Sequence, residues 1–296
     1  MSAPAEFSSL RYATHGRVAT ITLDRPERLN AIDEHMPGEI EAAVEQAAAD
    51  DSVHVIVIEG AGRAFCAGYD LKFFAETQGF NAGVQPMPWE PMVDFSFMHR
   101  FTRQYMSLWR SPKPSIAKVH GYAVAGGSDI ALCCDLVVMA EDAKIGYPPA
   151  RVWGCPTTAM WAYRVGPAHA KRMLLTGDLI DGREAHRIGL VNDVAPADEL
   201  DSMVERLAQR IAAVPRAQLA MHKLLINQVC DANGLPNTQM LATIFDGMAR
   251  HNPPGRAFKA RAEQVGFQKA VAERDGGEPI PQHPNELGGE TGDEPE

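Results

Sequence analysis

Two glycine-bearing turns constrain this chain most, because each follows directly on a short apolar run. The first turn is residues 65–70 after the run 53–58, and the second is residues 120–129 after the run 115–119. Short apolar runs rich in β-branched residues are typical of buried strands. Glycine lets a backbone approach a ligand closely, so the N–H groups of both turns could face one carbonyl oxygen. The pair suggests two halves of an oxyanion hole, although either glycine turn alone could simply end a strand.

Short strands alternate with helices up to about residue 197. Residues 18–23 predict a hairpin strand, and residues 136–140 predict another buried strand. A helix capped by Asn30 or Asp33 is expected to run through Ala49. A short helix is expected at residues 130–134, after the second turn. This alternation predicts an α/β core.

The chain divides by pattern into three parts. Residues 1–197 form the predicted core, and residues 198–275 form a helical region without strands that ends in a helix at 254–273. Residues 276–296 are acidic and rich in Gly and Pro. Such a composition predicts a disordered tail.

The composition argues against several classes of protein. Hydrophobic residues make up 45% of the 296 residues, enough to bury a full core, and the formal net charge is −10. This acidic balance, without a basic stripe, argues against a nucleic-acid partner. The five cysteines lack metal-ligand spacing, so we expect reduced thiols, no metal site and a cytoplasmic location. We expect neither a secretory signal nor a membrane span, because no apolar run is long enough to cross a bilayer.

Several segments match a known family pattern in their order and spacing. They are residues 18–26, 29–32, 63–71, 120–136 (which includes the second turn), 174–178, 185 and 189–191. Together they resemble the enoyl-CoA hydratase/isomerase, or crotonase, superfamily. The resemblance implies an α/β fold, a crotonase-like spiral of repeated ββα units with a helical C-terminal region used in assembly. It also implies a homo-oligomer, a trimer or dimer of trimers, and an acyl-CoA thioester as substrate, with no cofactor beyond the coenzyme A of that thioester.

The resemblance assigns the oxyanion hole to the backbone N–H groups of Tyr69 and Gly126. A backbone donor tolerates any side chain whose dihedral angles fit, so Tyr69 does not abolish the hole, although its ring would intrude on the pocket. A helix starting near Ser128 would add the positive end of its dipole. An enolate forming on the thioester oxygen would be stabilised there.

The resemblance also implies contacts to coenzyme A. Backbone carbonyls at Arg28, Leu29 and Ala67 would surround the adenine, and Lys72 would lie near the phosphates. Glu27 occupies another position that is often basic, so Arg28 or Arg25 would have to substitute for it. A solvated surface charge is the alternative role for Lys72.

The acid–base residues differ from those of a hydratase. Adding water across a double bond needs a base at Cβ and an acid at Cα, and the superfamily hydratases supply two glutamates. Asp129 occupies the first of these positions, where it is either the acid–base group or a helix cap. Pro149, which cannot titrate, occupies the second. The candidates for a second acid or base are Tyr147, His99, Asp94 and Glu76.

Three functions therefore remain open from the sequence. The first is an enzyme that stabilises an enolate of acyl-CoA, most readily an enoyl-CoA hydratase with Asp129 as acid–base group. The second is another crotonase reaction, such as hydrolysis, double-bond isomerisation or decarboxylation. The third, motivated by Pro149, is a non-catalytic acyl-CoA-binding protein.

Overall fold

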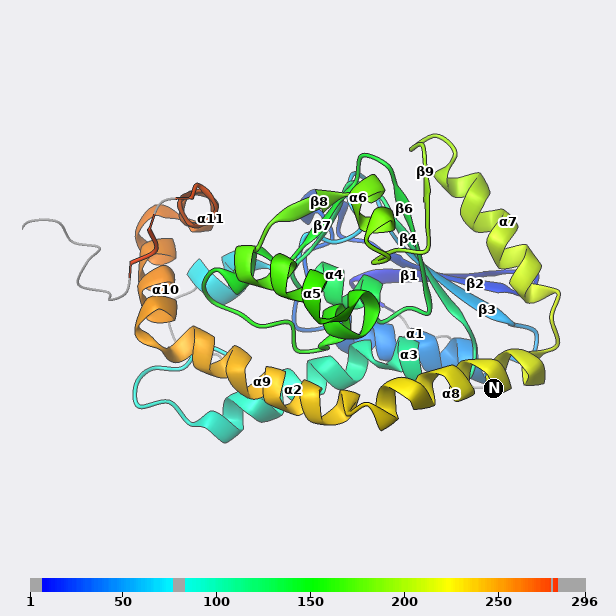
Figure 1. The fold of residues 1–296 in the computed structure, drawn as a ribbon, viewed down its shortest axis with the longest axis horizontal. Helices are drawn as coiled ribbons and strands as arrows, with labels where there is room; N and C mark the ends of the chain where they lie inside the picture. Colours follow the sequence, from blue (N-terminus) through cyan, green and yellow to red (C-terminus); the bar gives the residue numbers. More distant parts are fainter. Residues whose placement is uncertain (1–6, 77–82, 278, 282–296) are drawn as a thin grey trace, which may run out of the picture.

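The computed structural model describes residues 7–76, 83–277 and 279–281. Within them the chain forms two β-sheets, with helices between the strands and after the last strand (Figure 1). The larger sheet has, in spatial order, β1 (Leu10–His15), β2 (Val18–Leu23), β3 (Val55–Gly60), β4 (Ser115–Val119), β6 (Leu136–Ala140) and β9 (Asp193–Ala195). The smaller sheet has β5 (Tyr122–Val124), β7 (Lys144–Gly146) and β8 (Leu179–Asp181).

The larger sheet is mostly parallel. Only β1 and β2 pair as an antiparallel hairpin, and the other described neighbours in this sheet are parallel. Central parallel strands are covered on both faces, which explains why their sequences are apolar runs rather than alternating patterns. The predicted strands at 18–23, 115–119 and 136–140 are confirmed with those bounds, and the strand predicted at 53–58 runs from Val55 to Gly60.

Helices and short helical turns connect the strands. They are η1 (Pro26–Arg28), α1 (Met36–Ala49), η2 (Lys72–Glu76), α2 (Pro91–Tyr105), α3 (Ser107–Arg110), α4 (Gly126–Leu132), η3 (Pro148–Ala150), α5 (Met160–Thr176) and α6 (Gly182–Arg187). The carboxylate of Asp33 accepts the backbone N–H of Met36 at 2.9 Å, so Asp33 rather than Asn30 caps α1. Helix α4 begins at Gly126, earlier than the expected residue 130, because the glycines of the second turn form its first turn.

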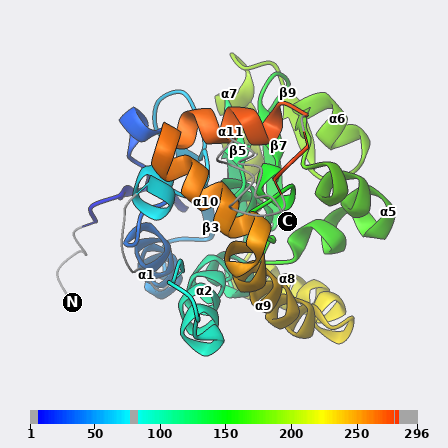
Figure 2. The ribbon, with the colours of Figure 1, turned by 90° about the vertical axis from the view of Figure 1, so that its left-hand side faces the viewer.

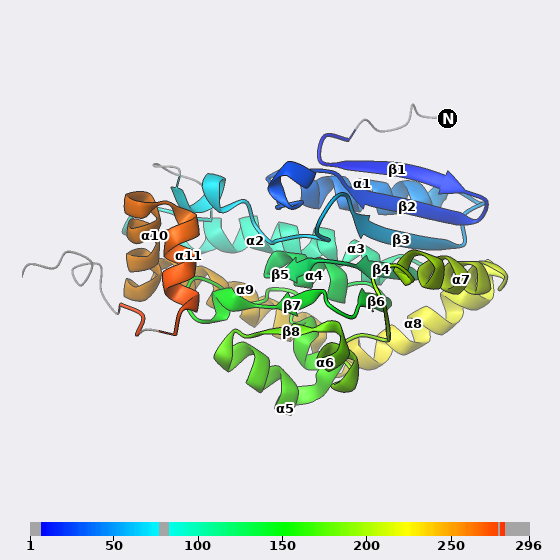
Figure 3. The same cartoon turned by 90° about the horizontal axis from the view of Figure 1, so that it is seen from above.

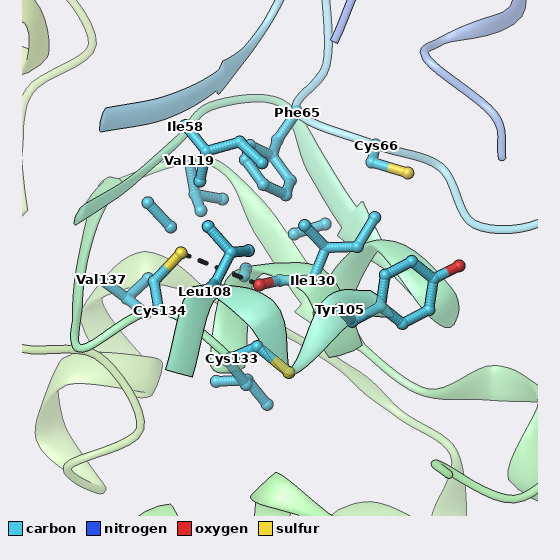
Figure 4. Packing of buried hydrophobic residues seen from close by; sticks show 14 of the residues in the cluster. Ile58, Phe65, Cys66, Tyr105, Leu108, Val119, Ile130, Cys133, Cys134 and Val137 are labelled. Atoms are coloured by element: carbon cyan, nitrogen blue, oxygen red, sulfur yellow. Dashed lines mark hydrogen bonds between the residues drawn. The ribbon is translucent and has the colours of Figure 1, made fainter. Parts of the chain in front are cut away.

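The apolar core lies directly beneath the two turns. Ile58 of β3 and Val119 of β4 pack with Phe65, which opens the first turn, and with Ile130 of α4 (Figure 4). All four side chains are fully buried. Tyr105 lies at the edge of this cluster, and its hydroxyl points away from the aliphatic side chains (Figure 4). The turns therefore rest on a close-packed support that limits their movement.

The C-terminal region is helical, as predicted. It contains α7 (Leu200–Ala212), α8 (Arg216–Ala232), α9 (Leu235–His251), α10 (Pro253–Val265) and α11 (Phe267–Asp275). Helices α8 and α9 run along one side of the molecule, and α10 and α11 lie at the end opposite α7 (Figures 1 and 3). The single helix predicted at 254–273 is two helices, because Gly266, with a φ of +82°, ends α10 and turns the chain into α11 (Figure 2).

Two sequence predictions are not tested by this fold. The domain boundary at residue 197 remains a prediction. Most of the predicted acidic tail, residue 278 and residues 282–296, lies outside the described residues. Among the helices that the structure describes, none combines the length and apolar character needed to cross a membrane.

Candidate active site

The two glycine turns are hydrogen-bonded to each other. The backbone N–H of Cys66 donates to the carbonyl oxygen of Tyr122 at 2.8 Å, and the N–H of Val124 donates to the carbonyl oxygen of Cys66 at 3.0 Å. These bonds form a short parallel bridge between the first turn and β5. The sequence prediction that both turns face one site therefore has a direct geometric basis.

Glycine is required where the turns touch. A Cβ on Gly127 would lie 2.2 Å from the carbonyl oxygen of Cys66, far inside van der Waals contact. Gly68 has a φ of +95°, a region that other residues rarely adopt, and a Cβ there would lie 2.9 Å from the carbonyl oxygen of Val124. The glycines thus hold the two backbones at a distance that any side chain would increase.

The N–H groups of Tyr69 and Gly126 have the geometry of free donors. The N–H of Ile32 donates to the carbonyl oxygen of Gly68, and the carbonyl oxygen of Ile32 accepts from the N–H of Asp70. Because successive residues of an extended chain direct their backbone groups to opposite sides, the N–H of Tyr69, which lies between these two residues, points away from Ile32. Gly126 is the first residue of α4, where backbone N–H groups lack helical partners. Within the described residues, neither N–H donates to an acceptor.

A largely apolar cavity of about 330 Å³ adjoins these donors. Tyr69 and Ala125, which precedes Gly126, are part of its wall, and the apolar side chains of Val84, Phe97 and Met98 also line it. The remaining wall includes Leu29, Ala67, Tyr147, Pro148, Pro149, Trp153, Asp246, Arg250, Val271 and Arg274. The cavity therefore lies between the turns, α2 and the C-terminal helices.

The ring of Tyr69 takes up part of this space. A Cβ on Gly126 would lie 2.9 Å from its Cε2 atom, so the ring packs directly on the glycine. It also stacks on Phe101 at 6.4 Å between ring centres, and its hydroxyl accepts from Tyr105 at 3.3 Å. These contacts hold the ring of Tyr69 in place at the pocket, where the sequence led us to expect it.

Asp129 is buried in the first turn of α4, with only 2% of its surface exposed. Burial raises the pKa of its carboxyl to about 8, the charge of Asp246 adds to this effect, and a hydrogen bond from Thr158 at 2.5 Å opposes it. The carboxyl does not line the cavity but lies behind its wall. Its charge nevertheless contributes to raising the pKa values of Tyr69 and Tyr147, two wall residues, after the larger effect of burial.

Tyr147 and Pro149 both line the cavity, at the start of η3 and within it. The hydroxyl of Tyr147 donates to the carbonyl oxygen of Cys155 at 2.9 Å. Pro149 brings no titratable group to the wall. Of the candidates for a second acid or base whose side chains the structure describes, Tyr147 is the one on the cavity wall.

The other candidates lie elsewhere. His99 is exposed on α2, where its ring stacks on Phe95 at 5.2 Å between ring centres, and it lies outside the cavity lining. Asp94 is buried but outside the cavity lining, with both carboxylate oxygens bound to Arg250. Glu76 ends η2, and its side chain lies outside the part of the chain that the structure describes.

Sequence reasoning missed the charged residues on the cavity wall, which are Asp246, Arg250, Arg274 and Asp275. Asp246 and Arg250 lie one turn apart on α9, both are more than nine-tenths buried, and they form an ion pair. The signal was present, because a carboxylate and a guanidinium at this spacing interrupt an otherwise apolar helical stretch. Nothing in the sequence indicated that α9 would pack against α2 beside the turns.

The comparison with known families decides what kind of site this is. The model for the enoyl-CoA hydratase/isomerase family matches residues 13–253. The chain belongs to this family. The match extends beyond the segments that carry the sequence resemblance and includes α7, α8 and α9.

Relatives of known name agree with this assignment. The putative enoyl-CoA hydratase EchA13 of Mycobacterium tuberculosis is 38% identical over 251 residues, which cover 78% of this chain and 77% of that protein. Crotonyl-CoA hydratase of Syntrophomonas wolfei is 31% identical, over 72% of this chain and 78% of its own length. The crystal structure of enoyl-CoA hydratase from Mycobacterium smegmatis is 46% identical, with a TM-score of 0.86, and covers 92% of this chain and 94% of its own. The predicted superfamily and the crotonase-like fold are confirmed.

Not all the residues assigned to coenzyme A lie at the cavity. Leu29 and Ala67 line it and are joined by a 3.0 Å hydrogen bond from the N–H of Ala67 to the carbonyl oxygen of Leu29. Arg28 and Lys72 are exposed and outside the lining. Arg25 forms ion pairs with Asp70 and Asp33, so it is engaged in holding the first turn rather than available to a phosphate. No group of three or more His, Cys, Asp or Glu side chains among the described residues is arranged to hold a metal ion.

Proposed function

We propose that this enoyl-CoA hydratase/isomerase family member hydrates an enoyl-CoA thioester, with the N–H groups of Tyr69 and Gly126 holding the thioester oxygen. The observation that supports this is the pair of backbone N–H groups without acceptors in the described structure, at the wall of an apolar cavity. When water adds at Cβ, the double-bond electrons move toward the thioester oxygen and form an enolate. Each donor aimed at such an oxyanion contributes about 10²- to 10³-fold to the rate.

Asp129 is the acid in this proposal. With its pKa raised to about 8, its carboxyl is mostly protonated at neutral pH and can supply the proton that Cα requires. Because it lies behind the cavity wall, a wall hydroxyl must pass the proton on. Tyr147 suits this role, because it lines the cavity and is electrostatically coupled to Asp129.

Replacement of Tyr147 by phenylalanine is expected to lower kcat for hydration about tenfold, because the proton path from Asp129 loses a hydroxyl. Initial rates at saturating crotonyl-CoA measure the effect. Tyr12→Phe is the matched control, since Tyr12 lies on β1 outside the cavity lining, and it should stay within about threefold of the wild type. Equal losses in the two variants would remove Tyr147 from the proton path.

The reaction type is tested by two assays on the same protein. Loss of the enoyl chromophore without release of free thiol supports hydration, whereas release of thiol from acyl-CoA indicates hydrolysis. Movement of the double bond or loss of carbon dioxide would indicate an isomerase or a decarboxylase. Tight acyl-CoA binding with no turnover of any of these substrates would identify a non-catalytic binding protein.

The protein is proposed to be a homo-oligomer, a trimer or dimer of trimers. Helix α8 has an inverted pattern, because its buried residues, Lys223 and Asn227, are polar and bind backbone carbonyl oxygens of the core. Its apolar residues are exposed and continue on α9: Met221, Leu224, Leu225, Ile226, Val229, Met240, Leu241, Ile244, Phe245 and Met248. An apolar face of this extent is typical of a subunit interface.

Leu225→Glu is expected to dissociate the oligomer, because the side chain is 69% exposed in the single chain and a charge there would be buried between subunits. Sedimentation velocity should show a shift to the mass of a single chain. Gln209→Glu, an added charge on an exposed position of α7 outside this apolar face, provides the control. An unchanged mass for Leu225→Glu would place the interface elsewhere.

A cytoplasmic location is part of the proposal. All five cysteines are free thiols, and three of them are buried. Coenzyme A enters only as part of the substrate, so no separate cofactor is proposed.

A further inference from the structure

The carboxylate of Asp246, on α9, lies close to Pro149, which brings no titratable group to the cavity wall. A Cβ placed on Gly154 would lie 3.1 Å from Cβ of Pro149, 3.3 Å from Oδ1 of Asp246 and 3.5 Å from the hydroxyl oxygen of Tyr147. These three groups therefore surround one point, and all three residues line the cavity. Asp246 thus brings a carboxylate to the position at which Pro149 brings none.

The ion pair with Arg250 does not by itself explain why the carboxylate of Asp246 is buried at the cavity wall. The guanidinium of Arg250 is already bound by both carboxylate oxygens of Asp94, at 2.7 and 2.8 Å. Asp246 is a second buried carboxylate on the same cation. Burying an additional charge is costly unless it serves a purpose, so its position at the cavity wall points to chemistry rather than to packing.

The carboxylate of Asp246 is held firmly but retains free acceptor capacity. Oδ1 accepts the N–H of Cys155 at 2.9 Å, and Oδ2 accepts from Arg250. Each carboxylate oxygen has two lone pairs, so each can accept one further hydrogen bond. Arg250 is itself anchored through its Nε to the carbonyl oxygen of Gly83 at 2.7 Å. A water molecule in the cavity would therefore meet an oriented acceptor.

We propose that Asp246 is the second catalytic carboxylate, the base that takes a proton from the water molecule adding to Cβ. This inference rests on the proposed hydration. The oxygen of water forms a bond to Cβ, its proton passes to Asp246, and the double-bond electrons move onto the thioester oxygen. The enolate then collapses, and Cα receives the proton that Asp129 supplies. Transfer of one proton from Asp246 to Asp129 through solvent restores the starting state.

Asp246→Asn tests the assignment with little change of shape. The amide can still accept from Cys155, and Arg250 keeps Asp94, so folding and acyl-CoA binding should persist. Hydration of crotonyl-CoA should fall about 100-fold or more, with the Kd for butyryl-CoA within about threefold of the wild type. Asp94→Asn is the matched control, because Asp94 is the other carboxylate that binds Arg250 but lies outside the cavity lining. The kcat of this variant should change less than about threefold.

A second reaction separates this role from the proposed function. Exchange of the α-protons of butyryl-CoA in heavy water needs the oxyanion hole and Asp129 but no water addition, so Asp246→Asn should retain it. Loss of hydration with retained exchange supports the assignment. Full hydration activity in Asp246→Asn, or equal losses in Asp246→Asn and Asp94→Asn, would overturn it while leaving the proposed function intact. A wild-type protein without hydration or exchange would instead refute the proposed function.

A double variant tests whether the carboxylate group itself is what the reaction needs. Pro149→Glu combined with Asp246→Asn places a carboxylate beside the same point from η3 instead of α9. Recovery of hydration to within about tenfold of the wild type would show that a carboxylate there is what the reaction needs. A folded double variant that binds butyryl-CoA and exchanges its α-protons but does not hydrate crotonyl-CoA would contradict the assignment.

Discussion

Replacement of Asp129 by asparagine is expected to lower kcat for hydration of crotonyl-CoA about 100-fold or more, because general acid catalysis contributes that much. Asparagine has nearly the same shape and can still accept the hydrogen bond from Thr158, so the fold and the Kd for acyl-CoA should be preserved. What it lacks is the proton for Cα. Steady-state rates across a range of substrate concentrations separate the loss of kcat from any change in KM.

The pH dependence of the wild-type enzyme gives an independent test of the same residue. Because burial raises the pKa of Asp129 to about 8, the acid form predominates at neutral pH and is lost above it. The rate should therefore fall as the pH rises through about 8, and this limb should be absent from the residual activity of Asp129→Asn. If the variant retains the alkaline limb, or turns over at the wild-type rate, Asp129 is not the acid.

Thermal stability provides a readout that does not depend on catalysis. A carboxyl whose pKa is raised on folding binds a proton more tightly in the folded chain than in the unfolded chain. Its contribution to stability is therefore present at acidic pH and declines as the pH rises toward about 8, where the buried group must ionise. The neutral amide of Asp129→Asn removes this penalty, so the variant should be more heat-stable than the wild type above pH 8. A lower Tm for the variant throughout this range would contradict the prediction that ionised Asp129 destabilises the fold.

The parts of the site that the sequence predicts are those defined by local chemistry. Tyr69, Gly126 and Asp129 were assigned through the resemblance to the family, whereas the glycines of the two turns and the runs before them could be located from the residues themselves. The reason is physical: a strand end followed by a tight turn needs particular residues at particular spacings, whatever surrounds them.

The residues that sequence reasoning missed depend on long-range packing. Asp246 and Arg250 reach the cavity only because α9 packs against α2, and helical periodicity alone does not show which helix a face will contact. For the same reason, Asp129 could be assigned to the first turn of a helix, but its place behind the cavity wall could not. The sequence also could not show which face of α2 meets the cavity, which receives Phe97 and Met98 while His99 faces outward.

Gly127→Ala is expected to destabilise the fold strongly and to slow hydration, because Gly127 is where α4 touches the first turn. The new Cβ would lie 2.2 Å from the carbonyl oxygen of Cys66 and 2.9 Å from its side chain, and a backbone oxygen cannot move aside as a flexible side chain can. Overpacking of this kind costs about 3 kcal/mol or more. The strain can be relieved only by separating the first turn from α4, which would also move the N–H of Tyr69 away from that of Gly126. Thermal unfolding should show a clearly lower Tm, and the folded fraction should hydrate crotonyl-CoA at least about tenfold more slowly, because the oxyanion donors no longer converge.

Gly38→Ala is the control that isolates this contact from the general effect of replacing glycine. Gly38 lies in the first turn of α1, where a Cβ would meet only the end of the Gln104 side chain, at 3.3 Å. Alanine in a helix restricts the unfolded chain and removes little from the folded one, so this variant should be unchanged or up to about 1 kcal/mol more stable. Its hydration rate should equal that of the wild type, since α1 does not line the cavity. If Gly127→Ala behaved like Gly38→Ala in both measurements, the close contact of the two turns could not be what aligns the donors.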